Sequence, residues 1–314
     1  MKKIIVCLFL LILSAKFGYT QDPLFTQTYA NSLYLNPAFA GTDNMQRINL
    51  NFRDQWPGIS GYVTYNISYD RNIIDSNFSI GFLGNRDEAG DNTIITTNAS
   101  LILAYQFHIK QFTLSAALQG TFRHMTLNQN NLAFGDQIDP TKGFIYYNTN
   151  ELFVPNIVNV VDFSGGVLGY GKNYFAGFSI NHFTQPNESF IEGDPSPLPM
   201  KFVFNGGVMI PVGLFTISPT FLYLRQQDFN SEVAECYLSN KHFMLGVGYR
   251  FGDAMIFTLG FQSKFLRIGY SYDYTTSALT NTATGGTHEL SAAVLLPYKS
   301  HKLKKVSGFT GPKF

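Results

Sequence analysis

The sequence predicts an all-β protein, a transmembrane antiparallel up-and-down β-barrel of about 14 strands, with 12 as the alternative count. Three observations support this fold: apolar and polar residues alternate in many segments, aromatic residues make up 16% of the chain, and charged residues only 14%. Alternation with a period of two suits strands with lipid outside and polar filling inside. Ordinary soluble domains have about a quarter charged residues, so a large soluble β-sandwich is the less favoured alternative.

The first 20 residues are expected to be a secretory signal peptide. Lys2 and Lys3 give a positive start, an apolar run at 4–13 is too short to remain as a membrane span, and small residues precede Gln21. Cleavage would remove Cys7 and leave Cys236 as the single cysteine. The exported protein would therefore have no internal disulfide and would rely on packing and strand pairing.

Residues 21–44 are expected to form an irregular N-terminal segment, a possible plug. The pairs Asn36-Pro37 and Ala40-Gly41 mark turns, because a residue before proline is pushed out of the helical region. The aromatic residues of this segment could pack inside a lumen or close one end of it.

The transmembrane barrel is expected to cover 45–297, and its clearest strand is 112–123. Leu114, Leu118 and Phe122 alternate there with Gln119, Thr121 and other mostly polar residues. The same pattern predicts thirteen strands, at 46–53, 61–70, 77–84, 95–109, 112–123, 161–170, 174–182, 201–210, 214–225, 242–251, 254–262, 265–274 and 288–296. Bacterial barrels usually have even strand numbers, which favours 14.

Long polar segments at 85–92, 125–159 and 185–199 are predicted to be loops. They alternate with short links, as in outer-membrane barrels, where short turns lie on one side and long loops on the other. After the barrel, 298–314 forms a basic tail with five lysines and no acidic residue. This tail is either a contact for a periplasmic partner or a flexible charged end.

No residue pattern predicts an enzyme, and no catalytic, cofactor-binding or metal-binding residue is assigned; the binding residues are unknown. No two histidines have the spacing of a zinc site, and His108 and His182, near strand ends, are expected to be solvated interfacial residues. Asp87, Glu88 and Asp91 fit no established calcium loop. The glycines at 165–171 before Lys172 lack the spacing of a phosphate loop, and close strand packing explains them better.

Four arginines are expected to lie in the lumen or at its rim. An arginine facing lipid would cost about 2–4 kcal/mol at the membrane midplane, whereas in the lumen it can pair with acidic side chains such as Asp70 or Asp273. The four are Arg123, Arg225, Arg250 and Arg267.

Residues 21–70 resemble the start of the PorP/SprF family, outer-membrane proteins of the type IX secretion and gliding system of Bacteroidetes. Weaker similarity continues through 132–137, 202–206 and 288–290, and the basic tail departs from the family pattern. The matching residues include Asp22-Pro23, Tyr34-Leu35-Asn36-Pro37-Ala38-Phe39-Ala40-Gly41-Thr42, Arg47, Arg53, Gln55-Trp56-Pro57 and Ser68-Tyr69-Asp70.

The resemblance implies location in the outer membrane and a role in export or cell-surface attachment of specific large surface proteins, such as gliding adhesins. The implied partners are C-terminal domains of secreted cargo proteins, periplasmic and outer-membrane secretion components, and outer-membrane lipid. The predicted loops 125–159 and 185–199 are the expected recognition elements. The residues alone leave a passive channel or small-solute transporter as the alternative. The acidic excess of the barrel region argues against a nucleic-acid partner.

Overall fold

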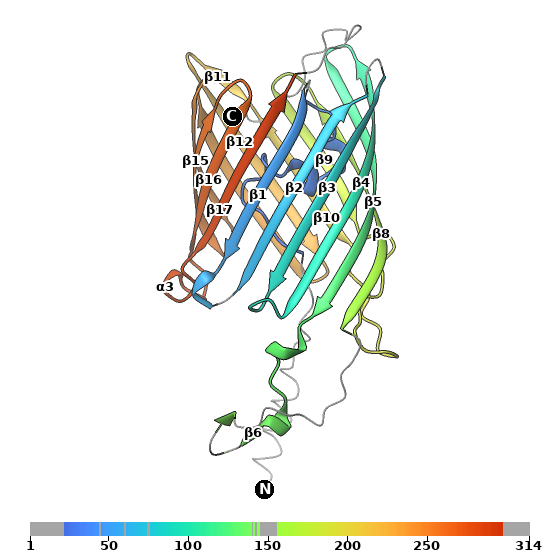
Figure 1. Ribbon diagram of the computed structural model, residues 1–314. Coiled ribbons are helices and arrows are strands. Elements are labelled where there is room, and N and C mark those ends of the chain that lie inside the picture. The colour runs from blue at the N-terminus through green and yellow to red at the C-terminus, as the bar shows by residue number, and fades with distance from the viewer. Residues whose placement is uncertain are drawn as a thin grey trace, which may run out of the picture.

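Fourteen strands form one closed antiparallel sheet in the computed structural model (Figure 1). The structure describes residues 22–43, 45–59, 61–73, 76–139, 141, 143–144 and 156–297. The predicted fold class is therefore confirmed. The expected signal peptide at 1–20 and basic tail at 298–314 lie outside the described residues.

The strands follow an up-and-down order, and each pairs with its neighbours in the chain. The first and last strands also pair, with Gln46 opposite Leu296, which closes the barrel. In chain order the wall consists of β1 (Gln46–Gln55), β2 (Tyr62–Asn72), β3 (Phe78–Ala89), β4 (Ile94–Ile109), β5 (Phe112–Leu127), β8 (Ile157–Tyr170), β9 (Tyr174–Asn181), β10 (Lys201–Val208), β12 (Phe215–Gln226), β13 (Phe229–Ser239), β14 (Phe243–Arg250), β15 (Ala254–Gln262), β16 (Leu266–Thr275) and β17 (Thr287–Leu296).

The remaining elements are short. A two-stranded hairpin of β6 (Ile138–Asp139) and β7 (Gly143–Phe144) lies apart from the wall, and β11 (Ile210–Val212) pairs with β12. The helical turns are α2 (Ser32–Leu35), η1 (Pro37–Phe39), η2 (Pro57–Ile59), η3 (Gln129–Asn131), η4 (Gly135–Gln137) and α3 (Asn281–Thr284). Among the described residues, no helix has the length and apolar character needed to cross a membrane.

Three parts of the wall differ from the sequence prediction. The predicted loop 125–159 is shorter at both ends, because β5 continues to Leu127 and β8 begins at Ile157. Strand β13 was not predicted, because only the two residues 227–228 separate it from β12 and its alternation includes the acids Glu232 and Glu235. The predicted loop 85–92 is mostly strand, since β3 continues to Ala89. Its acidic side chains are satisfied there: Asp87 accepts a hydrogen bond from Thr64, and Glu88 pairs with Arg86 at 2.7 Å.

The two faces of the wall differ in chemistry, as the alternation predicts. In β2, Tyr65 and Ile67 are exposed on the outer face, whereas Thr64 and Asn66 are buried on the inner face. Leu118 of β5 is 69% exposed to the outside. This apolar exterior matches the lipid-facing band of a membrane barrel.

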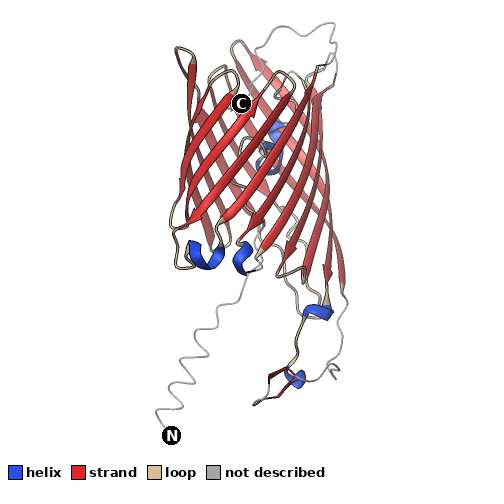
Figure 2. Cartoon of the chain, turned by 60° about the vertical axis from the view of Figure 1, so that its left-hand side comes forward, coloured by secondary structure: helices blue, strands red, loops and turns tan. Residues whose placement is uncertain are grey.

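The connections distinguish the two ends of the barrel (Figure 2). Short links at 73–77, 110–111, 171–173, 240–242 and 263–265 share one end, here called the turn end, where β1 begins and β17 finishes. The opposite end, here called the loop end, carries the connections 128–156, 182–200 and 276–286. In outer-membrane barrels short turns face the periplasm and long loops face outward, which orients this barrel.

Candidate functional site

Residues 22–43, here called the inner segment, run through the lumen (Figures 1 and 2). Every one of its side chains is buried or half-buried. The segment starts at the loop end, where Asp22 meets Lys201, and finishes at the turn end, where Gly41 meets Asp70. Its two helical turns are joined at Asn36, whose side chain accepts a hydrogen bond from the Ala38 N–H. That capping bond and the following proline are typical starts of a helical turn.

At the loop end, Asp22 is held by three basic side chains. Its carboxylate lies 2.6 Å from Lys201 Nζ, 2.7 Å from His182 Nε2 and 3.7 Å from a guanidinium nitrogen of Arg123. The other ring nitrogen of His182 lies 2.7 Å from Asp162, and Arg123 also pairs with Glu188. This Asp22 cluster consists of Asp22, Arg123, Asp162, His182, Glu188 and Lys201.

The loop residues of this cluster have shifted pKa values. Burial alone would lower the pKa of His182, but the Asp22 charge and the hydrogen bonds to Asp162 and Asp22 outweigh burial and raise the pKa. Burial raises the pKa of Glu188 despite the opposing charge of Arg123. The same contacts that hold Asp22 therefore favour the protonated form of His182.

A second cluster at the loop end forms around Thr26. Thr26 Oγ1 donates to Asp273 at 2.6 Å and accepts from Arg53 at 2.7 Å and from Arg250 at 2.9 Å. The Glu289 carboxylate accepts the Thr26 backbone N–H at 2.7 Å and pairs with Arg53 at 3.1 Å. Because Arg53 belongs to β1 and Glu289 to β17, the inner segment is bonded to both strands of the barrel seam.

At the turn end the contacts centre on Asp70, and Gln106 of β4 adds a bond from further along the chain. The Asp70 carboxylate accepts the Gly41 N–H at 2.8 Å and pairs with Arg47 at 2.9 Å, while Gln106 Nε2 donates to the Gly41 carbonyl at 2.9 Å. Gly41 has φ +69°, and a Cβ there would lie 2.2 Å from Ser79 Oγ. Only glycine fits this position without displacing the wall.

Between the two ends, the inner segment packs through apolar side chains. Leu33, Phe39 and their neighbours contact one apolar cluster of the wall, and Leu35 contacts a second. The branched aliphatic members of these wall clusters are Leu83, Ile102, Leu168, Val203, Leu222, Leu224, Val233 and Ile256. The middle of the lumen therefore has a hydrophobic core. Alternation with polar residues facing the lumen does not predict this core.

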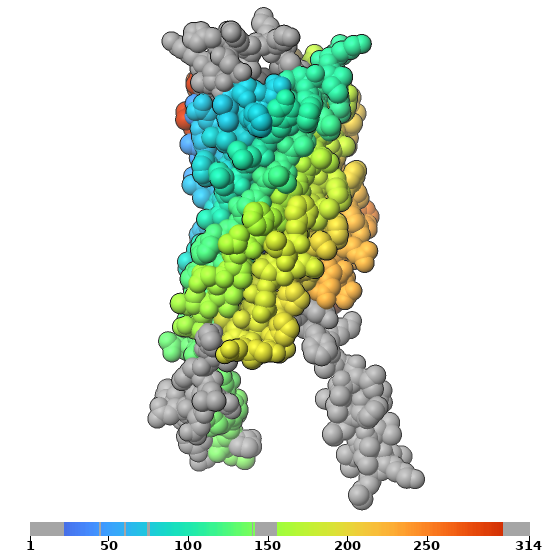
Figure 3. Space-filling view, turned by 90° about the vertical axis from the view of Figure 1, so that its right-hand side faces the viewer, coloured from blue at the N-terminus to red at the C-terminus, as the bar shows by residue number. Residues whose placement is uncertain are grey.

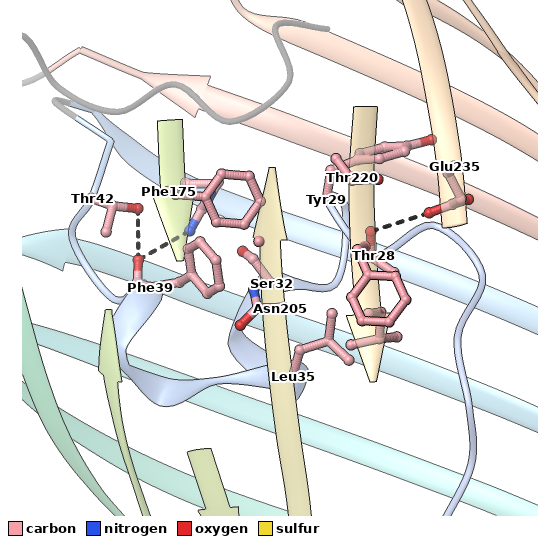
Figure 4. A pocket seen from close by; sticks show the side chains of 14 residues that line it. Thr28, Tyr29, Ser32, Leu35, Phe39, Thr42, Phe175, Asn205, Thr220 and Glu235 are labelled. Atoms are coloured by element: carbon pink, nitrogen blue, oxygen red, sulfur yellow. Dashed lines mark hydrogen bonds between the residues drawn. The ribbon is translucent and has the colours of Figure 1, made fainter. Parts of the chain in front are cut away.

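A small cavity remains beside this core (Figure 4). It has a volume of about 40 Å³ and lies between Tyr29, Leu35 and Phe39 of the inner segment and Phe175 and Glu235 of the wall. A volume of this size holds about three water molecules. In this region the inner segment leaves no wide passage.

The wall is shaped for the inner segment at Gly166. Asn36 Nδ2 donates to the carbonyls of Val167 at 3.1 Å and Phe178 at 3.3 Å, which brings its side chain against β8. A Cβ at Gly166 would lie 2.1 Å from Asn36 Oδ1. The glycines that resembled part of a phosphate loop thus permit close packing, as their position in a strand suggested.

Beyond the Asp22 cluster, the loop end contains a hollow of about 1280 Å³. The connection 182–200 forms one side of this loop-end hollow, and its course is fixed by a bridge between Asn187 and Pro197. The other sides come from β4, β5, β9, β10 and β12. The lining includes Met125, Leu127, Phe190, Ile191, Pro195, Pro199, Phe202, Tyr223 and Arg225. Figure 3 shows the yellow surface of this connection at the lower end of the barrel.

The structure corrects the expectation for His182 and agrees with that for His108. His182 is not a solvated interfacial residue: it is buried between Asp22 and Asp162, with φ +63°. His108, in contrast, is exposed. In the described part of the chain, no group of three or more His, Cys, Asp or Glu side chains is arranged to hold a metal ion.

The four arginines lie in the lumen or close to a strand end, as the cost of an arginine facing lipid predicts. Arg123 and Arg250 are buried in the lumen, and Arg250 pairs with Asp273 at 3.0 Å. Arg267 approaches Asp43 at 3.9 Å, and Arg225 is exposed close to the end of β12. Asp70 pairs with Arg47, which was not among the four arginines. The partners of Arg123 were also not predicted, because Asp22 and Glu188 are 101 and 65 positions away in sequence.

Several solved structures are similar to this chain at low sequence identity. A Pseudomonas aeruginosa FadL homologue is 12% identical, with 88% of this chain and 99% of that chain covered and a TM-score of 0.46. The toluene transporter TodX of P. putida is 12% identical, with 84% and 93% covered and a TM-score of 0.47. The KdgM porin is 6% identical, with 79% and 98% covered and a TM-score of 0.39. No curated protein sequence matches the chain.

The family comparison is more specific. The family described as type IX secretion system membrane protein PorP/SprF matches residues 17–294, which includes the inner segment and nearly all of the barrel wall. The apolar exterior and the arrangement of turns and loops agree with this assignment. The chain therefore belongs to the PorP/SprF family of type IX secretion and is a β-barrel of the outer membrane.

Proposed function

We propose that this protein binds an exported protein at the loop end and so supports its secretion or its attachment to the cell surface. The observation that carries this proposal is the combination of a lumen filled by the inner segment with an open hollow of about 1280 Å³ at the loop end. A filled lumen favours a rigid scaffold over a conduit. The hollow offers apolar side chains on a structured loop, where recognition residues commonly lie.

The expected partner is the C-terminal domain of a secreted cargo protein. Ile191 is 54% exposed in the hollow, close to Phe190 and three proline residues. Apolar side chains around a concave site gain affinity when a partner covers them, because apolar area is removed from water. Association with further secretion components would then place the cargo at the machinery.

A binding experiment with matched variants tests this proposal. The tagged barrel is purified in detergent and titrated with purified C-terminal domains of the surface proteins exported by the same cells. Ile191→Asp should weaken binding at least tenfold, because it buries a charge in the interface. Leu214→Asp is the control, since Leu214 is 90% exposed at the turn end. Absence of binding to the unmodified protein, or equal effects of the two variants, would contradict the proposal.

The passive-channel alternative gains no support from the lumen. Three sets of contacts fix the inner segment, and the cavity beside its apolar core has a volume of only about 40 Å³. A conducting pore would require the segment to leave. Planar-bilayer recordings of the full-length protein distinguish the two functions, because a channel would give large steady currents.

A further inference from the structure

One strand of the wall extends well past its neighbour. β8 pairs with β5 along its whole length, from Ile157 opposite Thr126 to Tyr170 opposite Thr113. It pairs with β9 only from Gly165 to Tyr170. The last backbone bond on that side runs from the Phe183 N–H to the Phe163 carbonyl at 2.9 Å. Residues 157–161 therefore form a sheet edge with no backbone partner among the described residues.

The direction of the edge groups follows from the alternation of antiparallel pairing. The Asn156 carbonyl accepts the Leu127 N–H of β5, whereas the Phe163 carbonyl points the other way, towards Phe183. Backbone groups of successive residues alternate between the two sides of a strand. The N–H and C=O groups of Ile157, Asn159 and Val161 consequently point away from β5, along an edge of about 16 Å.

The side chains of this edge are unusually apolar. Ile157 is 49% exposed and Val161 56% exposed on the outer face, while Val158 and Val160 are half-buried on the inner face. These β-branched residues favour extended backbone. Natural proteins usually protect such an edge with charge, proline or a covering element, because it readily pairs with another chain. The edge lies beside β5, whose Met125 and Leu127 line the loop-end hollow.

We infer that residues 157–161 of β8 form a strand-addition site for an extended, apolar segment of the exported protein. The added strand would run antiparallel to β8 and form hydrogen bonds with the outward-pointing N–H and C=O groups of Ile157, Asn159 and Val161. Its apolar side chains would pack beside those of β8 on both faces of the sheet. This inference rests on the proposed function and deepens it, because it states how the cargo is held. Backbone bonds provide affinity in this mode, and side chains at alternate positions provide specificity.

A second copy of this barrel does not fit the edge. Two copies in one membrane have the same orientation, so their β8 strands would run in the same direction across the bilayer. Barrel strands tilt by about 35–45°, and the two edges would cross instead of aligning. A strand from a water-soluble domain at the cell surface has no such restriction.

Strand addition at this edge can be tested by removing one backbone N–H group. Val161→Pro removes the outward-pointing N–H and places a ring at the edge, while the β5 side of the strand keeps its bonds. Val161→Thr is the matched control, because it keeps both the N–H and the branched shape. Each variant is checked for the heat-dependent electrophoretic mobility of a folded barrel and then titrated with the cargo C-terminal domain that binds the unmodified protein.

Val161→Pro is expected to weaken binding at least tenfold and Val161→Thr by less than twofold. In the unmodified complex, hydrogen exchange resolved to single residues should slow at Ile157, Asn159 and Val161 and stay unchanged at Val158 and Val160. Equal binding by the two Val161 variants, with unchanged exchange at the edge, would overturn strand addition but leave loop-end binding intact. If no C-terminal domain binds the unmodified protein, both the proposed function and this inference are wrong.

Discussion

The two ends of the lumen hold the same segment in different ways. At the turn end, Gly41, Arg47 and Asp70 meet within 30 positions of sequence, and one carboxylate makes most of the contacts. At the loop end, Asp22 and Thr26 are held by side chains from strands up to 263 positions away. The Asp70 contacts at the turn end thus involve only β1, β2 and the adjoining inner segment, and Gln106 of β4 and Arg267 of β16 add more distant ones. The loop end requires the complete barrel.

Because the inner segment is held at both ends of the lumen, we expect this segment, and not the wall, to close the lumen. Deletion of 22–42 removes the Asp22, Thr26 and Gly41 contacts at the two ends and should convert a silent protein into a steady channel, the largest effect expected. Planar-bilayer conductance measures it, with the unmodified protein as the control. A deletion variant that folds as a barrel and remains silent would show that another part of the chain closes the lumen.

Charge at the loop end should matter more for stability than charge at the exposed rim. Arg53→Ala leaves Glu289 buried without its arginine partner, while Asp273 keeps Arg250, and should lower the free energy of unfolding by about 3–5 kcal/mol. Arg225→Ala, at an exposed position, should change it by less than about 0.5 kcal/mol. Denaturant titration of the two variants provides the comparison. Similar losses of unfolding free energy in the two variants would mean that the ion pairs around Thr26 contribute no more to stability than an exposed arginine does.

The close approach of Asn36 to the wall can be tested with two glycines. Gly166→Ala places a methyl group 2.1 Å from Asn36 Oδ1 and should cost about 1–3 kcal/mol. Gly120→Ala is the control, because its Cβ meets only the Phe163 ring at 3.5 Å, an ordinary contact. Thermal unfolding of both variants measures the difference. Equal stability would indicate that Asn36 can move aside without loss.

The smallest expected effect is a pH dependence at the loop end. The raised pKa of His182 means that the folded protein holds this proton more tightly than the unfolded chain. Its stabilising contribution is complete below about pH 6.5 and is lost as the pH rises through the folded-state pKa. Glu188, whose pKa is also raised, acts in the same direction. The facing groups Asp22, Asp162, Arg123 and Lys201 all take part in this coupling.

Unfolding measured from pH 6 to pH 9 checks this dependence. His182→Gln removes the titrating group and should flatten the decline of stability with pH. If the variant shows the same decline as the unmodified protein, the dependence arises elsewhere in the molecule.

Most of the wall could be predicted from sequence, because alternation with a period of two is a local signal. Thirteen of the fourteen strands were recognised in this way. β13 was not, since a two-residue turn merges it with β12 and Glu232 and Glu235 interrupt its apolar character. The predicted loop 85–92 was mostly wrong for a related reason: Asp87 and Glu88 appear loop-like in sequence, yet each has a partner at the rim.

The contacts of the inner segment could be predicted only at the turn end. Gly41, Arg47 and Asp70 all belong to the stretch that resembles the PorP/SprF family, so their proximity has a sequence signal. No pattern of neighbouring residues predicts the contacts of Asp22 with His182 and Lys201, because these residues meet only in the closed barrel. The same limit applies to the free edge of β8. The unpaired edge of β8 is found only by comparing the residues that pair with β5 with those that pair with β9.

The bonds of Thr26 to both strands of the seam have a consequence for assembly. Glu289 of β17 accepts the Thr26 N–H and pairs with Arg53 of β1, so the last strand to be synthesised completes contacts with one of the first residues exported. Docking of Thr26 therefore stabilises the seam between β1 and β17. A barrel that closes without placing 22–43 in its interior would leave a water-filled passage across the outer membrane.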